Sequence, residues 1–317
     1  MIAPACSHEK LSKHGKDRKG NQRWKCARCG QTVTRQMERP LGSMRIDIAD
    51  AAKVLGMLLE GMSIRACQRL TGMKIGTICD LIIHVGDNCG RLLETTVRGV
   101  HSSFVEMDEL WSFVGMKAKT AERKNLGPEV GDSWTWIAID ADSKLILSHA
   151  VGQRDESTCH RFLDRLNNAT VGRMQVTSDG LGLYTHNVPF TLGSRVDFAQ
   201  LIKSYSSSQE ETRYSPAQIM KADKVARFGS PDMERVSTSY SERLNLSVRM
   251  HNRRFTRLTN AHSKTRDHHE AMINIFVAWY NFSRKHETLK KQTPAMASGL
   301  TDKVWTIEDL LRNAANC

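Results

Sequence analysis

Apolar positions between residues 47 and 94 recur three and four residues apart, which is the spacing of helices that each bury one face. Ser63 is a residue type that caps helix N-termini, and Gly72 lies in a short turn between two helical stretches. Two short helices joined by a glycine-containing turn are typical of a helix-turn-helix. The pattern predicts such a unit over residues 46–98, although a helical hairpin that only packs would give the same pattern.

The second helix of this unit would carry the side chains that meet DNA. We expect Ile75, Ile78 and Leu81 to pack inward, and Lys74 and Thr77 to face outward. A recognition helix presents its N-terminal residues to base edges in the major groove. Lys74 and Thr77 are therefore candidate DNA contacts.

After residue 100 the helical spacing gives way to runs of β-branched and aromatic residues, which are typical of strands. The predicted strands cover residues 104–114, 134–140, 144–151, 174–179 and 195–199. A helix is predicted between the third and fourth of them, over 156–166, and mainly helices beyond residue 237. Asp140 and Asp142 are expected to be turn residues of the hairpin rather than ligands. Hairpins followed by alternating helix and strand favour a mixed α/β sheet.

The net charge of the chain indicates the class of its binding partner. Its 317 residues contain 46 Lys and Arg against 34 Asp and Glu, a formal net charge of +12. Such a field attracts polyanions and supplies non-specific phosphate binding, so nucleic acid is the expected partner. No apolar stretch approaches the roughly 20 residues of a membrane span, and eight cysteines in so long a chain do not suggest a disulfide scaffold. We expect a soluble cytoplasmic protein.

Residues 1–45 are dense in charge and have too few apolar side chains for a core, so a metal would have to hold them together. Cys26 and Cys29 with the following glycine have the C-x-x-C-G form of a zinc knuckle. Cys6 and His8 are the candidates to complete the ligand set. The alternative is a degenerate ribbon that binds no zinc. The neighbouring Arg23 and Lys25 would face DNA phosphates.

Three acidic positions stand out by their context. Asp108 interrupts an otherwise apolar strand, where a charge is costly unless something pairs with it or coordinates it. Asp179 ends a predicted strand and precedes a glycine, which is where open α/β sheets place functional groups. Glu242 lies in a predicted helix. Glu106 shares the strand face of Asp108, so alternation alone does not separate these two acids.

Glu242 heads a polar stripe on its helix. Asn245 and Arg249 follow at the spacing that puts side chains on one face. The chain beyond is basic and free of acids up to residue 266, and it supplies further candidate DNA contacts: Arg253, Arg254 and Arg257. Three clustered carboxylates repel one another unless a divalent cation offsets their charge, and Mg²⁺ prefers such ligands. Phosphodiester chemistry by two-metal sites needs these parts and no side-chain nucleophile.

At these residues the sequence resembles the transposases of the insertion-sequence-one family, across nearly the whole chain. The likeness is carried by residues 107–115, 134–140, 177–180, 197–200, 213–217, 242–245, 252–261, 279–282, 286–289 and 293–295.

The resemblance implies a ribonuclease-H-like catalytic core that uses Asp108, Asp179 and Glu242 with Mg²⁺ or Mn²⁺, and it selects Asp108 over Glu106. Arg249 takes the place of the basic residue that follows the glutamate in many such enzymes. The resemblance also implies a zinc ribbon and a helix-turn-helix that bind terminal inverted repeats in double-stranded DNA, and a homo-oligomer that synapses two ends. The chain departs from the pattern at Glu9, where the ribbon would have a cysteine.

The expected organisation is α/β: a zinc-ribbon segment over 1–45, a helix-turn-helix over 46–98, a ribonuclease-H-like mixed-sheet domain over 99–290, and a tail with a short helix over 291–317. The leading hypothesis is a transposase that binds element ends, cleaves a strand with Mg²⁺ and joins it to target DNA. The alternative is a non-catalytic or decayed DNA-binding repressor derived from a transposase.

Overall fold

The structure, a computed structural model, describes residues 10–18, 20–34, 40–205, 219–256 and 260–317. The sequence candidates Cys6, His8 and Arg257 lie outside the described residues.

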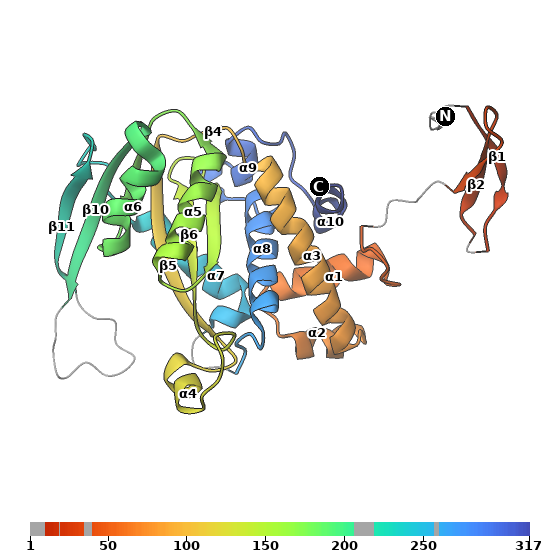
Figure 1. The fold of residues 1–317 in the computed structure, drawn as a ribbon, viewed down its shortest axis with the longest axis horizontal. Helices are drawn as coiled ribbons and strands as arrows, with labels where there is room; N and C mark the ends of the chain where they lie inside the picture. The colour runs from red at the N-terminus through yellow and green to blue at the C-terminus, as the bar shows by residue number, and fades with distance from the viewer. Residues whose placement is uncertain (1–9, 19, 35–39, 206–218, 257–259) are drawn as a thin grey trace, which may run out of the picture.

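The N-terminal part is a small antiparallel sheet, drawn apart from the larger body in Figure 1. Its strands pair in chain order: β1 (Leu11–Lys16), β2 (Gln22–Cys26) and β3 (Thr32–Thr34). Nearly all of its side chains are exposed or half-buried, and Cys26 is the exception among them. So little apolar burial contributes little stability, which agrees with the apolar-poor composition of the segment.

Three helices follow: α1 (Ile48–Leu59), α2 (Ile64–Thr71) and α3 (Ile75–Thr96). The Ser63 side chain accepts a hydrogen bond from the amide of Ala66 and so caps α2, as expected. Gly72 ends α2 with φ at 73°, a left-handed conformation that suits glycine. The third helix has 22 residues and is longer than the short helix that the pattern predicted.

The inward face of α3 differs from the prediction at one position. Ile78 and Leu81 are fully buried as expected, but Ile75 is 38% exposed. The difference has a simple reason, because Ile75 is the first residue of the helix and lies at its end. Lys74 is exposed and Thr77 is half-buried.

The main sheet has six strands in the order β11-β10-β9-β5-β6-β7. β5 pairs antiparallel with β6, and β6 with β7, while β9 lies parallel to both β5 and β10. The strands are β5 (Phe104–Val114), β6 (Gly131–Asp140), β7 (Ile146–Gly152), β9 (Met174–Ser178), β10 (Val196–Tyr205) and β11 (Ile219–Phe228). β4 (Val100–His101) and β8 (Thr170–Val171) form a separate short pair. The predicted mixed α/β sheet is confirmed.

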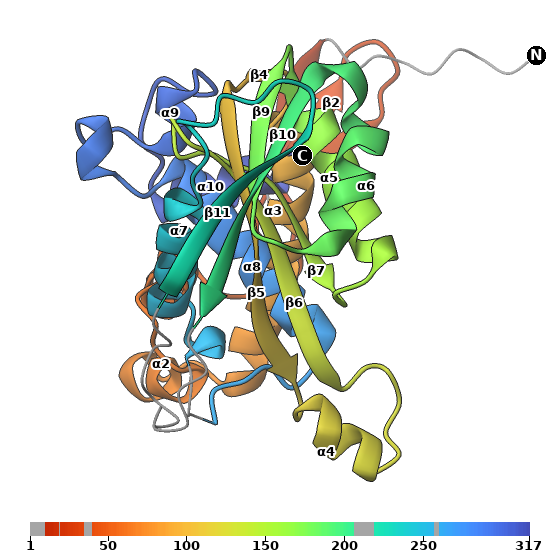
Figure 2. The ribbon, with the colours of Figure 1, turned by 90° about the vertical axis from the view of Figure 1, so that its left-hand side faces the viewer.

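Helices cover both faces of this sheet (Figure 2). α5 (Glu156–Ala169) and α6 (Gly182–Leu192) pack on one face, and α7 (Ser239–His251) and α8 (Arg266–Phe282) pack on the other. α4 (Ala118–Arg123) lies in the β5–β6 connection and projects beyond the sheet. Short helical turns complete the chain: 193–195, 253–255, 287–289 and α9 (Pro294–Ala297).

The N-terminal helices share their core with the sheet domain. α3 packs along α8, and Gly86 faces Ala271 so closely that a β-carbon on the glycine would lie 2.4 Å from that of Ala271. The last helix, α10 (Ile307–Ala315), packs against α1 and α3. Within the described residues every helix is too short or too polar to cross a bilayer.

The predicted hairpin is confirmed, and its turn is organised by Asp140. The carboxylate of Asp140 accepts a hydrogen bond of 2.7 Å from the amide of Ser143 and another from the hydroxyl of Ser102. Asp142 is exposed and lies 3.6 Å from Arg235. β10 is longer than predicted, while α4, α6 and β11 were not predicted.

Candidate active site

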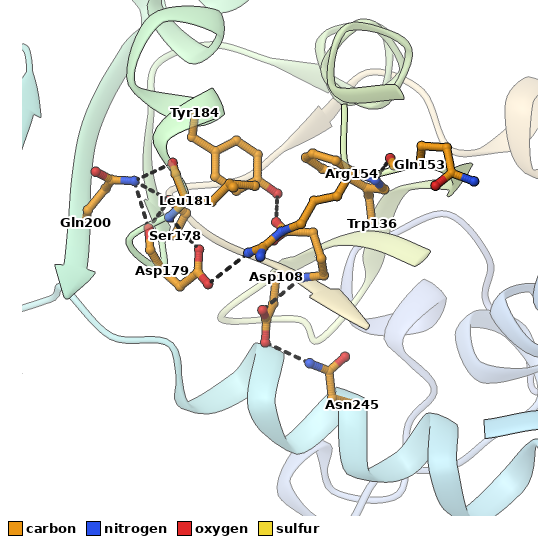
Figure 3. Close-up of polar contacts among 11 residues, drawn as sticks. Asp108, Trp136, Gln153, Arg154, Ser178, Asp179, Leu181, Tyr184, Gln200 and Asn245 are labelled. Atoms are coloured by element: carbon orange, nitrogen blue, oxygen red, sulfur yellow. Dashed lines mark hydrogen bonds and ion pairs between the residues drawn. The ribbon is translucent and has the colours of Figure 1, made fainter. Parts of the chain in front are cut away.

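The register of two parallel strands brings the acidic positions together. β5 pairs with β9 from Phe104 opposite Gln175 to Met107 opposite Ser178, where β9 ends. Asp179 therefore follows the end of β9 directly beside the next residues of β5. Carboxylate oxygens of Asp108, Glu109 and Asp179 lie within 4.8 Å of one another. We call these three residues the acid cluster. The side chains of Asp108 and Asp179 are labelled in Figure 3.

Asp108 is held from two sides. One carboxylate oxygen accepts a hydrogen bond of 2.8 Å from the amide of Glu109, and the other accepts one of 2.7 Å from the side-chain amide of Asn245 on α7. Burial raises the pKa of Asp108 to about 6, and the charges of Asp179 and Glu242 act in the same direction. A nearby cation would stabilise the ionised form of such a buried carboxylate and lower its pKa.

Glu109 is the member of the cluster that the sequence reasoning missed. Its carboxylate is buried, accepts a hydrogen bond from the hydroxyl of Tyr184 on α6, and lies 3.0 Å from the guanidinium of Arg154. Burial raises the pKa of Glu109 to about 7, and the charge of Asp179 adds to the effect. The run of acids at 106–109 was the available signal, but alternation points Glu109 away from the face of Asp108.

Asp179 lies at the mouth of the cluster. Its carboxylate accepts a hydrogen bond of 3.0 Å from the amide of Leu181, and it lies 3.8 Å from the guanidinium of Arg154. Arg154 therefore bridges Asp179 and Glu109 from the loop that follows β7 (Figure 3). The side chain of Asp179 is 43% exposed, so the mouth of the cluster is open to solvent.

Glu242 comes from α7, on the same side as Asn245. Its carboxylate pairs with the ammonium group of Lys203 on β10 and accepts a hydrogen bond of 2.9 Å from the hydroxyl of Thr238. Glu242 is not one of the three residues whose oxygens lie within 4.8 Å, but its charge acts on Asp108. The structure thus brings Asp108 and Asp179 together, and it puts the charge of Glu242 within electrostatic reach of Asp108.

Glu106 has a different position from Asp108, although both lie on one face of β5. One carboxylate oxygen of Glu106 accepts hydrogen bonds from the amides of Tyr240 (2.7 Å) and Ser241 (2.9 Å). These amides belong to the first turn of α7, whose N-terminal N–H groups have no partner within the helix. Glu106 anchors the helix that carries Glu242 and Asn245.

The donor set fits a divalent cation. Three carboxylates that converge from two strands offer only oxygen ligands, which is what hard cations such as Mg²⁺ prefer. Their mutual repulsion and burial raise the pKa values of Asp108 and Glu109, and a bound cation would offset that cost. The cluster is compatible with a divalent metal ion.

The basic candidates after Glu242 have different surroundings. Arg253 is exposed and Arg249 is half-buried. Arg254 is half-buried as well, and desolvation lowers its pKa to about 10. Asn245 is buried, with its amide on Asp108.

The candidate ribbon ligands lie at the end of β2. Cys26 is buried and Cys29 is exposed in the turn that follows. The amide of Gly30 donates to the carbonyl of Cys26 over 2.9 Å, and Gly30 has a φ of 73°. The knuckle turn therefore has the tight form that the glycine permits. Arg23 is half-buried on the same small sheet, and Lys25 is exposed.

The chain is similar to known proteins over parts of its length. Residues 103–205 match the family model described as IS1 transposase. The insertion element iso-IS1n protein InsB of Shigella dysenteriae is 33% identical over 84 residues, which are 26% of this chain and 53% of that protein. The chain thus spans about half the length of this curated relative. A solved structure of the piggyBac transposase synaptic complex with hairpin DNA aligns with 84% of this chain and 69% of its own, at 10% identity and a TM-score of 0.41.

Proposed function

Residues 103–205 match the IS1 transposase family model, and from that premise we propose that the chain is the transposase of an insertion element. In this proposal it binds the terminal inverted repeats of the element, cleaves a DNA strand and transfers the end to target DNA. The observation that carries the proposal is the convergence of the Asp108 carboxylate, on β5, with that of Asp179, which follows the end of β9. The charge of Glu242 on α7 acts on Asp108 as well.

The catalytic residues in this proposal are Asp108, Asp179 and Glu242, with Glu109 as a further carboxylate of the same site. They would hold Mg²⁺ or Mn²⁺, which when bound would activate the attacking oxygen and stabilise the leaving one at phosphorus. Asn245 fixes the orientation of the Asp108 carboxylate through its amide. Arg154 and Lys203 hold Glu109, Asp179 and Glu242 in place by ion pairs.

The remaining candidates serve DNA binding in the proposal. Lys74 precedes α3 and Thr77 lies in its first turn, where a recognition helix would present them to DNA. Arg249 follows the catalytic glutamate on α7, and Arg253 and Arg254 come after that helix. Arg23 and Lys25 would contact phosphates from the small sheet, with zinc held by Cys26, Cys29 and the candidates Cys6 and His8. A homo-oligomer would synapse two element ends. The protein would act in the cytoplasm, associated with the nucleoid through its DNA substrate.

The test is strand cleavage and joining on a supercoiled plasmid that carries the element's own ends, with Mg²⁺. Wild type should give nicked and joined products, and Asp108→Asn, Asp179→Asn and Glu242→Gln should each lose them by at least about a hundredfold, because each removes a carboxylate that would hold the divalent cation. Asp164→Asn is the matched control, since Asp164 is an exposed acid of α5 that is not part of the acid cluster.

Two other outcomes would change the assignment. Products from all three single variants would show that the catalytic residues are misassigned. End binding without products from wild type would favour the alternative, a repressor or a decayed copy.

A further inference from the structure

Four ring side chains line one margin of the main sheet, and we call Trp111, Phe113, Trp134 and His262 the aromatic platform. Trp111 and Trp134 are direct cross-strand partners on β5 and β6, so they share a face. The rings of Trp111 and Phe113 are 5.8 Å apart, and those of Phe113 and His262 are 4.6 Å apart. A bridge between Val114 and Ser263 brings His262 to this position from a distant part of the chain.

The platform begins where the helical layer ends. Trp136 is two residues beyond Trp134 on the same face of β6, and it is fully buried against Phe162 of α5 and Tyr184 of α6. Trp134, Trp111 and Phe113 stay half-buried instead. Large aromatic side chains contribute most to stability when they are covered, so half-buried rings in a row offer an unused apolar surface.

Cations surround the platform. The ammonium group of Lys117 lies 5.8 Å from the Trp111 ring centroid, and the guanidinium of Arg154 lies 4.8 Å from that of Trp134. The Lys264 ammonium lies 2.8 Å from the ring nitrogen of His262. All three cations are exposed. On the strand pair, Asp132 lies opposite Phe113, and its carboxylate accepts a hydrogen bond from the amide of Ala118.

One of these cations also touches the acid cluster. Arg154 covers Trp134 and at the same time lies 3.0 Å from Glu109 and 3.8 Å from Asp179. The platform therefore starts one arginine side chain away from the carboxylates. A nucleic-acid strand with a phosphate at the acid cluster would pass its next nucleotides over these rings.

We propose that the aromatic platform binds unpaired bases of the DNA strand whose phosphate lies at the acid cluster, a proposal that rests on the transposase function above. Exposed rings stack on the π-faces of bases with little regard to sequence, and flanking cations hold the phosphates. In an intact duplex the base faces are covered by their neighbours, so the platform engages only bases that have left the stack, as happens when a site is opened or an end is frayed.

A partner protein is the other occupant that an apolar surface could have. The positive charge around the platform favours nucleic acid. Lys117, Arg154 and Lys264 surround the aromatic rings, and proteins that bind single strands combine cations and aromatic rings in this way. Protein–protein interfaces deplete lysine instead.

The test compares two single-stranded probes of equal length: an oligothymidylate and an abasic deoxyribose-phosphate chain. Binding is measured by fluorescence anisotropy with the full chain and with EDTA present, so that no cleavage occurs. Wild type should bind the probe with bases about tenfold more tightly than the abasic probe. The double variant Trp111→Ala/Phe113→Ala should lose that preference while keeping its affinity for the abasic probe. Trp111→Phe should keep most of the preference, since it retains a stacking ring.

Phe190→Ala is the matched control, because Phe190 is an aromatic residue of α6 that is 71% exposed and lies outside the platform. It should keep the preference for bases. Melting temperatures establish that the variants compared are folded. Equal binding of the two probes by wild type, or a preference that survives in the double variant, would overturn the proposal. A double variant that keeps the preference but sediments as a smaller assembly would identify the platform as a protein interface. Because the assay involves no metal and no strand transfer, its failure is separate from failure of the transposase assignment.

Discussion

Glu106 and Asp108 lie two residues apart on β5, yet their carboxylates meet different groups. Glu106 accepts the amides at the start of α7, whereas Asp108 faces Asp179 and the amide of Asn245. The alternation of the strand does not distinguish the two acids. Their contacts do, because α7 begins beside Glu106 and reaches Asp108 one turn later, at Asn245. One carboxylate stabilises a helix end, and the other carries a cost of burial.

Burial raises the pKa of both acids, but two helix amides stabilise the charge of Glu106, whereas the charges of Asp179 and Glu242 add to the cost at Asp108. We therefore predict opposite effects on stability. In metal-free buffer at neutral pH, Asp108→Asn should raise the free energy of unfolding by about 1 kcal/mol, since burial and the neighbouring acids penalise the charge of Asp108. Glu106→Ala should lower it by about 1 to 2 kcal/mol, because two amides of α7 lose their acceptor. Urea denaturation measures both. A loss of stability in Asp108→Asn comparable to that in Glu106→Ala would contradict this account.

His269 of α8 predicts a pH dependence away from the acid cluster. It is buried between the hydroxyls of Ser112 and Ser263, and burial lowers its pKa to about 3, helped by Arg254 and Arg266. The native state therefore stays unprotonated below pH 6.5, where the unfolded state binds a proton. Its contribution to stability is present at neutral pH and falls as the pH drops.

Urea denaturation at pH 7 and pH 5 isolates this contribution. Between pH 7 and pH 5 the free energy of unfolding of wild type should fall by about 2 kcal/mol more than that of His269→Gln. The figure comes from about 1.4 kcal/mol for each pH unit below 6.5, the pKa of an ordinary histidine. His186→Gln, at an exposed histidine of α6, should keep the pH dependence of wild type. Identical pH dependence in His269→Gln and wild type would argue against a buried neutral histidine.

The residues of the site differ in how well they could be predicted from the sequence. Asp179 could be predicted because an acid that ends a strand before a glycine has a known place in α/β sheets. Asp108 needed the family resemblance to separate it from Glu106. Glu109 was missed because its role depends on Tyr184 and Arg154, which reach it from elements far along the chain.

Among the elements, the ones predicted well were those whose pattern is strong on its own. The hairpin of β6 and β7 and the capped helix α2 were predicted because turns and caps are local. α6 was missed because it starts at Gly182, contains Pro189 and shows no clear apolar face. β11 was missed because its side chains are mostly exposed and only its pairing with β10 makes it a strand.

The contact between α3 and α8 gives a prediction about two glycines of one helix. Gly86→Ala should lower the free energy of unfolding by about 1 to 3 kcal/mol, because the new methyl group would meet the Ala271 backbone at 2.5 to 2.7 Å. Gly76→Ala on the same helix meets no atom within 4 Å and should instead stabilise by up to about 1 kcal/mol through helix propensity. Thermal or urea denaturation compares them. Equal changes in the free energy of unfolding for Gly86→Ala and Gly76→Ala would show that the close approach of Gly86 to Ala271 does not matter for stability.

At the scale of the whole molecule, the small sheet and the larger body differ in what stabilises them. The body has a continuous apolar core, whereas the small sheet depends on little burial. We therefore expect purified protein to carry zinc at about one ion per chain, with Cys26 and Cys29 among the four ligands of a structural site. Cys29→Ser should lose the zinc without shifting the melting of the body.

Elemental analysis of protein prepared without chelator tests this, and Cys317→Ser is the control, since Cys317 is an exposed cysteine at the other end of the chain. A zinc-free wild type would mean that the ribbon is degenerate. A chelator that removes zinc should weaken DNA binding while the main melting transition stays in place.

The seating of α10 on α1 and α3 also sets an order of events during synthesis. Leu310 and Leu311 are buried in this contact, and Ile307 reaches within 3.3 Å of where a β-carbon on Gly56 would lie. The ribosome makes α1 and α3 well before α10, an interval on the order of tens of seconds at about 5 to 20 residues per second. Through that interval the side chains of α1 and α3 that α10 covers stay exposed, and this part of the core is completed only after α10 has been made.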